Sequence, residues 1–197
     1  IALRVREFVE QEVVPLERHT LSHDVAGLDA TSAHLQPLAR KAGIWGPRLP
    51  QAYGGMGLNW RDAQSILEEA GRSPLGPLAL HCAPPEGPNI GTIDALASDA
   101  QRERWLVPLV EGQIRSCFAM TEPSPGTGSD PRMLRTRARR ARGGWVIDGH
   151  KWFISGAEGA SVAIVMAATD EGPTFFLVDT ANPGWRHLRT IAALDGY

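Results

Sequence analysis

Two short motifs carry residue types that suit the binding of a polar ring or a phosphate. The first, Met120-Thr121-Glu122-Pro123, leaves a predicted strand and runs into Gly126-Thr127-Gly128-Ser129-Asp130. A loop rich in Gly, Ser and Thr exposes successive backbone N–H groups and hydroxyls, which can bind carbonyl or phosphate oxygens. The residues alone are equally consistent with an ordinary polar connection.

The second motif is Lys151-Trp152-Phe153-Ile154-Ser155-Gly156. Neighbouring side chains on a strand point to opposite faces, so one of Trp152 and Phe153 should face the core and the other a ligand or solvent. Ser155 would then present a hydroxyl or an amide at a ring edge. Plain core packing explains this pattern more readily when it is taken by itself.

Two further patterns favour structural roles. The loop Tyr53-Gly54-Gly55-Met56-Gly57 is read as a close-packed turn between helices and not as a phosphate loop, because no Lys-Ser/Thr follows it and no strand precedes it. A second pattern is a run of six arginines, which would suit the phosphates of a ligand but is better explained as a solvated edge strand. These are Arg132, Arg135, Arg137, Arg139, Arg140 and Arg142.

The elements that must position these motifs change in kind near Gly112. Before it, apolar residues recur at helical spacing, which predicts helices near 2–14, 32–41, 59–70, 89–97 and 98–111, with Pro15 ending or kinking the first. Asn59 and Ser98 are predicted N-caps. After it the period is two, which predicts strands near 116–120, 135–140, 162–168 and 174–179, and a hairpin over 145–154 with Asp148-Gly149 at its turn.

A helical half followed by a strand half indicates two segregated modules. We therefore predict an α+β chain, with an all-helical N-terminal domain over residues 1–113. A mainly antiparallel β domain, barrel-like or a sandwich, follows over residues 114–197 and is expected to be incomplete at its C-terminal end.

The composition of the 197 residues excludes several classes of function. A net charge of -2 gives no sign of nucleic-acid or anionic membrane binding, and no apolar run approaches the ~18 residues that span a bilayer. Cys82 and Cys117 are too few for a disulfide framework and have no metal-ligand spacing, so a reducing cytoplasm is the simplest expected location.

In their order and spacing, the motifs resemble the acyl-CoA dehydrogenase family over nearly the whole chain. The resemblance rests on Tyr-Gly-Gly-Met-Gly-Leu from Tyr53, Met-Thr-Glu-Pro from Met120, Gly-Ser-Asp from Gly128, and Asp-Gly-His-Lys-Trp-Phe-Ile-Ser-Gly from Asp148. The sequence from Ser116 to Pro123 is most similar to the branch of mammalian family members ten and eleven.

The resemblance implies a fold of three domains, namely a helical domain, a β domain and a C-terminal four-helix domain, with the cofactor FAD held between them. The C-terminal domain is expected to be absent from this chain. The resemblance also implies that the flavin is contacted by seven residues and the substrate by Ser129. The seven are Phe118, Met120, Thr121, Gly128, Phe153, Ile154 and Ser155. The loop Ser124–Thr127 is about two residues longer than the common family form.

The reaction that the resemblance implies is α,β-dehydrogenation of an acyl-CoA, with the β-hydrogen leaving as hydride to flavin N5. The electrons would then pass to an electron-transfer flavoprotein or a similar acceptor. The resemblance also implies a homodimer or homotetramer that serves fatty acid metabolism. Because the family's usual base lies in the C-terminal helical domain, no catalytic base is assigned, and Glu122 is read as structural. Two alternatives stay open: a flavin monooxygenase or oxidase of the same fold, and a non-catalytic binding or assembly module.

Overall fold

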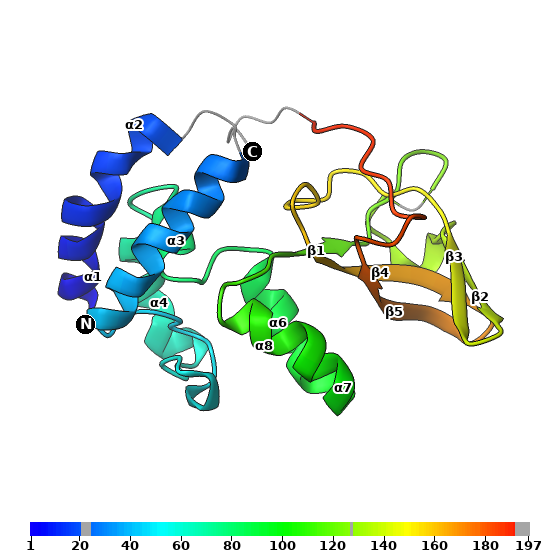
Figure 1. Cartoon of the computed structure of the whole chain (residues 1–197), viewed down its shortest axis with the longest axis horizontal. Helices are drawn as coiled ribbons and strands as arrows, with labels where there is room; N and C mark the ends of the chain where they lie inside the picture. Colours follow the sequence, from blue (N-terminus) through cyan, green and yellow to red (C-terminus); the bar gives the residue numbers. More distant parts are fainter. Residues whose placement is uncertain (21–24, 127, 192–197) are drawn as a thin grey trace. The chain divides into compact units, whose positions relative to one another are not determined.

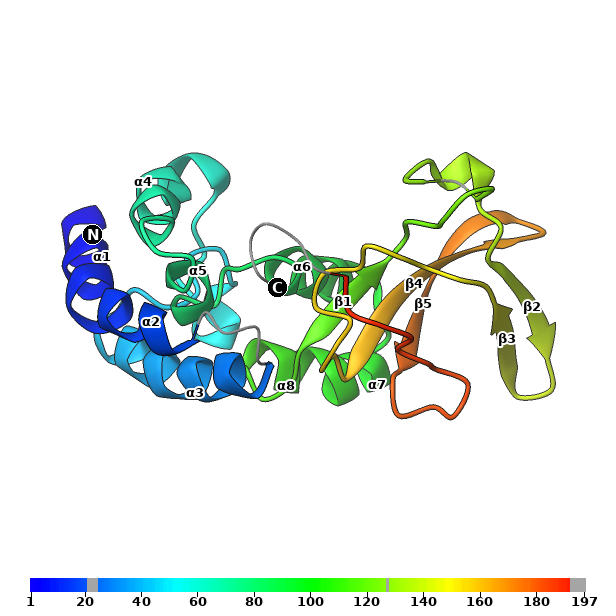
Figure 2. The same ribbon diagram turned by 90° about the horizontal axis from the view of Figure 1, so that it is seen from above.

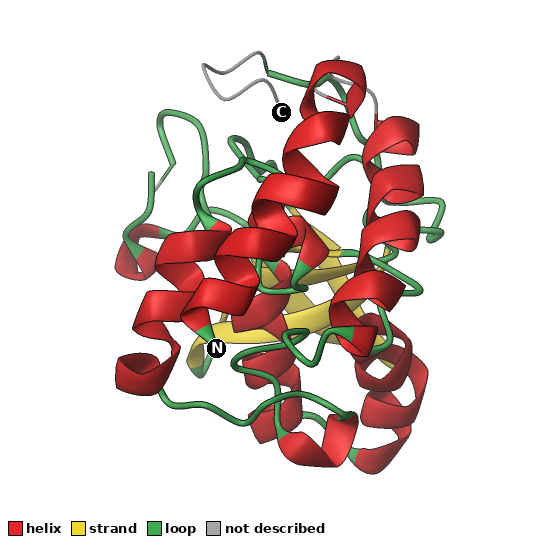
Figure 3. Ribbon diagram, turned by 90° about the vertical axis from the view of Figure 1, so that its left-hand side faces the viewer, coloured by secondary structure: helices red, strands yellow, loops and turns green. Residues whose placement is uncertain are grey.

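The computed structural model describes residues 1–20, 25–126 and 128–191, which form two compact units. The first unit, Ile1–Gln113, is helical, and the second, Ile114–Ile191, contains the sheet (Figure 1). This confirms the predicted α+β class with helices before strands, and Figure 3 shows the two kinds of element by colour. In the part of the chain that the structure describes, no helix is long and apolar enough to cross a membrane.

The helical unit is built from α-helices of 3 to 17 residues, some of which are joined by π-helical and 3-10 turns. The α-helices are α1 (Ala2–Phe8), α2 (Glu17–Thr20), α3 (Val25–Lys41), α4 (Trp60–Ala70), α5 (Gly76–Ala79), α6 (Glu86–Leu96), α7 (Asp99–Gln101) and α8 (Val107–Val110). The π-helical turns are Val9–Val13 and Arg102–Leu106, and the 3-10 turns are Val14–Leu16 and Gln51–Tyr53.

The predicted caps at Asn59 and Ser98 are confirmed, whereas one predicted helix limit is wrong. The Asn59 side chain accepts from the amide of Asp62 at 3.0 Å, and Ser98 forms a capping box with Gln101. Pro15 lies in the 3-10 turn Val14–Leu16, where the regular helix is interrupted before α2, in line with its predicted effect. Helix α3 begins at Val25 and not near residue 32, since a single Gly27 costs a helix only about 1 kcal/mol and does not stop it.

A buried polar network lies inside the helical unit. His81 is 6% exposed, its Nε2 lies 3.0 Å from the carbonyl oxygen of Leu109, and its Nδ1 lies 3.3 Å from the side-chain amide nitrogen of Gln36. A carbonyl can only accept, so Nε2 carries the proton and Nδ1 accepts from Gln36. The ring also stacks on Trp45, with centroids 5.2 Å apart and planes 4° apart.

The second unit contains one five-stranded sheet centred on β4 (Figure 2). Its strands are β1 (Ser116–Ala119), β2 (Arg137–Ala141), β3 (Gly144–Asp148), β4 (Val162–Thr169) and β5 (Gly172–Asp179). β4 pairs in parallel with β1, antiparallel with β5 along its whole length, and with β2 at Arg137 and Ala168. Most paired residues are therefore antiparallel, as predicted.

The β2–β3 hairpin turns at Arg142-Gly143, so the predicted turn at Asp148-Gly149 is wrong. Ala141 pairs with Gly144, and Gly143 between them has a φ of 84°, which a glycine adopts without steric cost. Gly149 is needed for a different reason. A Cβ placed on it would lie 2.2 Å from Oγ1 of Thr136, so only glycine lets the chain pass Thr136 this closely.

One face of the sheet packs a small core of buried residues, namely Cys117, Ala119, Ala160, Ala163 and Val165. Ile147, Ile154, Ala157, Val178 and Trp185 pack against it. The segment 149–160, which links β3 to β4, forms no strand and carries the second motif across the edge of this core. Its non-strand backbone means that simple strand alternation does not describe Trp152 and Phe153.

Candidate functional site

Glu122 is the centre of the site and is only 2% exposed. Its Oε2 accepts from the amide of Arg135 at 2.7 Å, and its Oε1 accepts from the amide of Thr136 at 2.8 Å and from Nζ of Lys151 at 2.9 Å. One carboxylate therefore joins the end of the first motif, the approach to β2 and the start of the second motif.

The electrostatics of this group follow from its partners. Burial by itself would raise the pKa of Glu122, but the hydrogen bonds from Thr136, Arg135 and Lys151 lower it to about 2, because they favour the charged form. Burial lowers the pKa of Lys151, although the bond to Glu122 opposes that change. Near neutral pH Glu122 is thus an ion with its charge matched by fixed donors.

The same lysine fixes the residues on either side of Thr121. Nζ of Lys151 also donates to the carbonyl oxygen of Met120 at 2.8 Å, and the amide of Trp152 donates to the carbonyl oxygen of Thr121 at 3.1 Å. Two motifs that are about thirty residues apart in sequence are therefore directly bonded. Within the described residues, the Thr121 hydroxyl makes no hydrogen bond.

The Gly/Ser/Thr loop returns to the same place. The amide of Glu122 donates to the carbonyl oxygen of Gly128 at 3.0 Å, which brings Gly128 and the exposed Ser129 beside the end of the first motif. Gly126 makes the return possible, because a Cβ there would lie 2.7 Å from Cβ of Glu122 and from the carbonyl oxygen of Pro123. Thr127 lies outside the described residues.

Phe153 presents an exposed aromatic face in the second motif. Its ring is 62% exposed, and its centroid lies 4.6 Å from that of Trp152 with the planes 48° apart. Its φ is 50°, a conformation that is unfavourable for a bulky side chain and that tends to occur at functional sites. Ser155, two residues later, is exposed, and its hydroxyl has no hydrogen-bond partner among the described residues.

The remaining two predicted site residues lie on opposite faces of the sheet. Phe118 is half-buried and packs edge-to-face on Phe175, with centroids 5.6 Å apart. It alternates with Cys117 and Ala119, which face the core, so Phe118 points away from that core. The side chain of Ile154 packs against the core itself, which leaves its backbone as the part nearest the exposed residues of the motif.

The structure thus brings together Met120, Thr121, Gly128 and the Trp152-Phe153 pair, with Ser129 and Ser155 next to them in sequence. Sequence reasoning did not assign a role to Lys151, although it is the residue that bonds both motifs. The available signal was an acidic residue in one motif and a basic residue in the other. The exposed ring of Phe153 and the exposed hydroxyl of Ser155, two residues later in the chain, suit a flat, partly polar ring.

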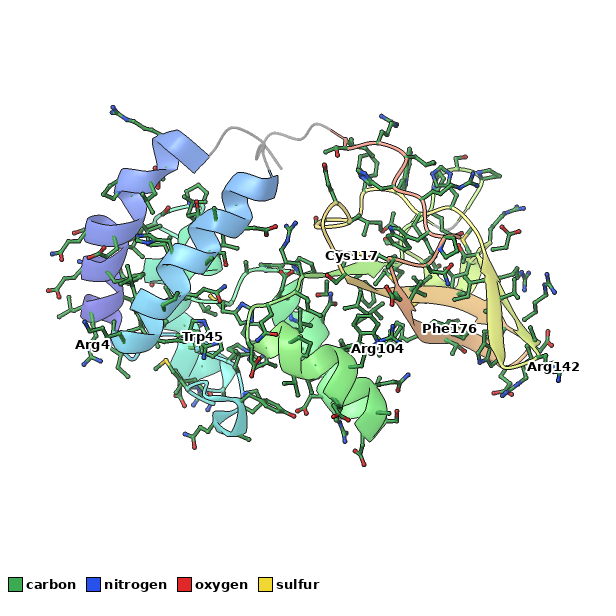
Figure 4. The ribbon with its side chains drawn as sticks, in the orientation of Figure 1. Arg4, Trp45, Arg104, Cys117, Arg142 and Phe176 are labelled. Carbon is green, nitrogen blue, oxygen red and sulfur yellow. The ribbon has the colours of Figure 1, made fainter. Side chains whose placement is uncertain are left out.

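Three of the six arginines, Arg137, Arg139 and Arg140, lie on β2, which pairs with β4 only at Arg137, so the edge-strand interpretation holds for the rest of that strand. β2 lies between β4 and β3, and β3 is the outer strand of the hairpin. Arg132 pairs with Asp130 at 2.8 Å, the guanidinium of Arg140 lies 4.5 Å from the centre of the Trp145 ring, and Arg142 lies at the hairpin tip (Figure 4). The run is solvent-exposed, as expected.

The glycine loop at Tyr53 is a structural connection, as predicted. Its amides are used within the loop: Gly54 donates to Gln51, Gly55 to Pro50, and Met56 to Gly46. Because a phosphate loop needs free amides, this one cannot cradle a phosphate in the same conformation.

Comparison with known proteins supports the resemblance along the whole chain. Residues 1–113 match the model described as acyl-CoA dehydrogenase, N-terminal domain, and residues 117–197 match acyl-CoA dehydrogenase, middle domain. The acyl-CoA dehydrogenase family member 10 of Mus musculus is 32% identical over 94% of this chain and 19% of its own length.

Two solved structures share the fold. A putative acyl-CoA dehydrogenase from Mycobacterium abscessus has a TM-score of 0.89 and 32% identity, covering 98% of this chain and 53% of the other. A glutaryl-CoA dehydrogenase from Mycobacterium smegmatis, solved in complex with FADH2, has a TM-score of 0.70 and 31% identity, covering 93% and 45%. The chain therefore spans about a fifth of the mouse protein and about half of each solved relative.

Proposed function

The chain belongs to the acyl-CoA dehydrogenase family, and on that premise we propose that it acts in a FAD-dependent oxidoreductase that dehydrogenates an acyl-CoA thioester between its α and β carbons. The observation that carries the proposal is the hydrogen bond from the Trp152 amide to the Thr121 carbonyl, which joins Thr121 directly to the segment that carries the exposed Phe153. The shared fold of a relative solved with FADH2 supports the choice of cofactor.

The residues present fit a flavin. An isoalloxazine ring needs an apolar surface for its face and donors for its polar edge, and the two motifs offer the Phe153 ring together with the hydroxyls of Thr121 and Ser155. Met120, Gly128, Phe118 and the backbone of Ile154 complete the proposed contact set. When bound, FAD would supply the acceptor for the hydride that leaves the β-carbon.

The chain's own residues would orient the acyl-CoA and the cofactor and polarise the reacting groups. Ser129, exposed beside Gly128, is proposed to contact the acyl-CoA. Glu122 is not the base that removes the α-proton, because its carboxylate is buried, holds three donors and has a pKa of about 2. We assign the base to none of the described residues, and we propose that the electrons pass to an electron-transfer flavoprotein or a similar acceptor.

The proposal is tested by the spectrum and by turnover. The purified protein, supplied with FAD, should show the absorbance near about 450 nm that is typical of an oxidised flavin. Anaerobic addition of a panel of acyl-CoA thioesters of different chain length should bleach that band, and mass spectrometry should find the matching enoyl-CoA, which lacks two hydrogens.

The other outcomes identify the competing functions. Rapid reaction of the reduced flavin with oxygen, with an oxygenated product, would favour a monooxygenase or oxidase of this fold. A protein that stays colourless after FAD is added would contradict the proposal and would favour a binding or assembly module.

A further inference from the structure

We infer that Glu122 and Lys151 are positioning residues for the flavin: their ion pair sets the place of Thr121 and of the Trp152-Phe153 segment. The inference rests on the proposed function, since it concerns the same site. In this role Glu122 and Lys151 act through the residues that they bond and need not contact the cofactor themselves.

The first argument is the way in which Thr121 is enclosed by bonds. The residue before it is held through the Met120 carbonyl, which accepts from Nζ of Lys151 at 2.8 Å. The residue after it is held through the Glu122 side chain and through its amide, which donates to Gly128 at 3.0 Å. The carbonyl of Thr121 itself accepts from Trp152 at 3.1 Å. The backbone is fixed on both sides, while the Thr121 hydroxyl has no hydrogen-bond partner among the residues that the structure describes, which is the arrangement that a ligand contact requires.

The second argument is energetic. Burying an ion pair costs desolvation free energy that the attraction between the charges offsets only in good geometry, so a buried pair is weak evidence for added stability. This pair is nearly dry, with side chains 2% exposed at Glu122 and 11% exposed at Lys151. An apolar pair could fill the same space, but it could not bond the Met120 carbonyl or the Arg135 and Thr136 amides. The ion pair therefore fixes the orientation of these backbone groups.

The third argument is the conformation that follows Lys151. Phe153 keeps a φ of 50° with its ring 62% exposed, so its own packing does not explain the unfavourable backbone. Such a conformation persists when the surroundings fix it. Here the two preceding residues are fixed, Lys151 by its ammonium and Trp152 by its amide.

The decisive variant is Lys151→Met, which keeps the aliphatic stem and removes the ammonium. Lys151→Arg keeps the charge, and Arg139→Met is the matched control because Arg139 is an exposed residue of β2 outside this cluster. Each protein is examined first without cofactor, by amide hydrogen exchange, and then with FAD, by affinity, by visible circular dichroism and by reduction potential.

Without cofactor, we expect the Trp152 amide to exchange about tenfold faster in Lys151→Met than in the wild type, with the rest of the sheet unchanged. With FAD, we expect at least about tenfold weaker binding and an altered visible circular dichroism signal, both partly restored in Lys151→Arg and absent in Arg139→Met. Visible circular dichroism and reduction potential report the surroundings of the ring, which a loss of stability alone does not change.

The two proposals fail in different ways. A wild type that binds no FAD contradicts the proposed function, and the exchange of the Trp152 amide still decides whether the pair orders the segment. A folded Lys151→Met protein with wild-type exchange, affinity and spectrum overturns the inference. If Lys151→Met does not fold, Glu122→Gln takes its place, since it keeps the shape and removes the charge, and wild-type values in that variant overturn the inference equally.

Discussion

Nζ of Lys151 lies 2.9 Å from Oε1 of Glu122 and joins two motifs through residues that are 29 positions apart in the sequence. The contact turns a strand end and an irregular loop into one ordered surface. On that surface the Phe153 ring is exposed and Thr121 is half-buried, and the buried Glu122 lies next to Thr121 in the chain.

Gly149→Ala should destabilise the sheet unit by about 1–3 kcal/mol, the usual cost of forcing an extra carbon into a packed site. The added Cβ would lie 2.6 Å from Cβ of Thr136, so the backbone would have to move. Urea unfolding measures the difference. Gly144→Ala is the matched control, because no atom lies within 4 Å of its added Cβ, and an equal loss in both variants would contradict the proposed close contact.

Local signals predicted much of the helical unit and several strands. Asn59 and Ser98 cap their helices through neighbours three residues away, so the information lies within one turn. The predicted turn of the hairpin was wrong because Asp148-Gly149 is a dipeptide typical of turns. In the folded chain Gly149 is needed instead for its close approach to Thr136, which the local sequence does not show. Likewise, no pattern of a single segment predicts a bond between residues 122 and 151, or the positive φ of Phe153.

Stability should fall as the pH drops from about 6.5 to about 4, because His81 resists protonation in the folded protein. Burial and the charge of Arg40 lower its pKa to about 4 from the ordinary 6.5. In that window the unfolded chain takes up a proton that the folded chain does not, so the free energy of unfolding decreases with falling pH, by up to about 3 kcal/mol, and the effect is absent above it.

Urea unfolding at a series of pH values measures this slope. His81→Asn should flatten it, since asparagine tolerates the φ of 52° and does not titrate. The exposed His34 provides the control, because His34→Asn should leave the slope as it is. Equal slopes in the wild type and His81→Asn would show that another group causes the acid sensitivity.

Phe153→Asn should separate stability from cofactor binding. Asparagine accepts a φ of 50° better than phenylalanine does, and the lost ring is 62% exposed, so the free energy of unfolding without cofactor should stay within about 1 kcal/mol of the wild type. The affinity for FAD should fall, because the aromatic face is gone. Thermal unfolding with and without FAD measures both effects, and a large loss of stability without cofactor would mean that Phe153 belongs to the core.

Thr121→Val should weaken FAD retention or slow flavin reduction by an acyl-CoA, because valine keeps the shape of threonine and removes the hydroxyl. The backbone bonds that hold the residue involve its carbonyl and its neighbours, so they should survive the change, and the fold should stay intact. The loss of one hydrogen bond to the ring corresponds to about 1 kcal/mol, or about a fivefold weaker affinity. Thr121→Ser keeps the hydroxyl and should behave as the wild type, as fluorescence titration of FAD and stopped-flow reduction would show. Identical affinity and reduction rate in Thr121→Val and the wild type would remove the Thr121 side chain from the site, even if the segment around it still binds the flavin.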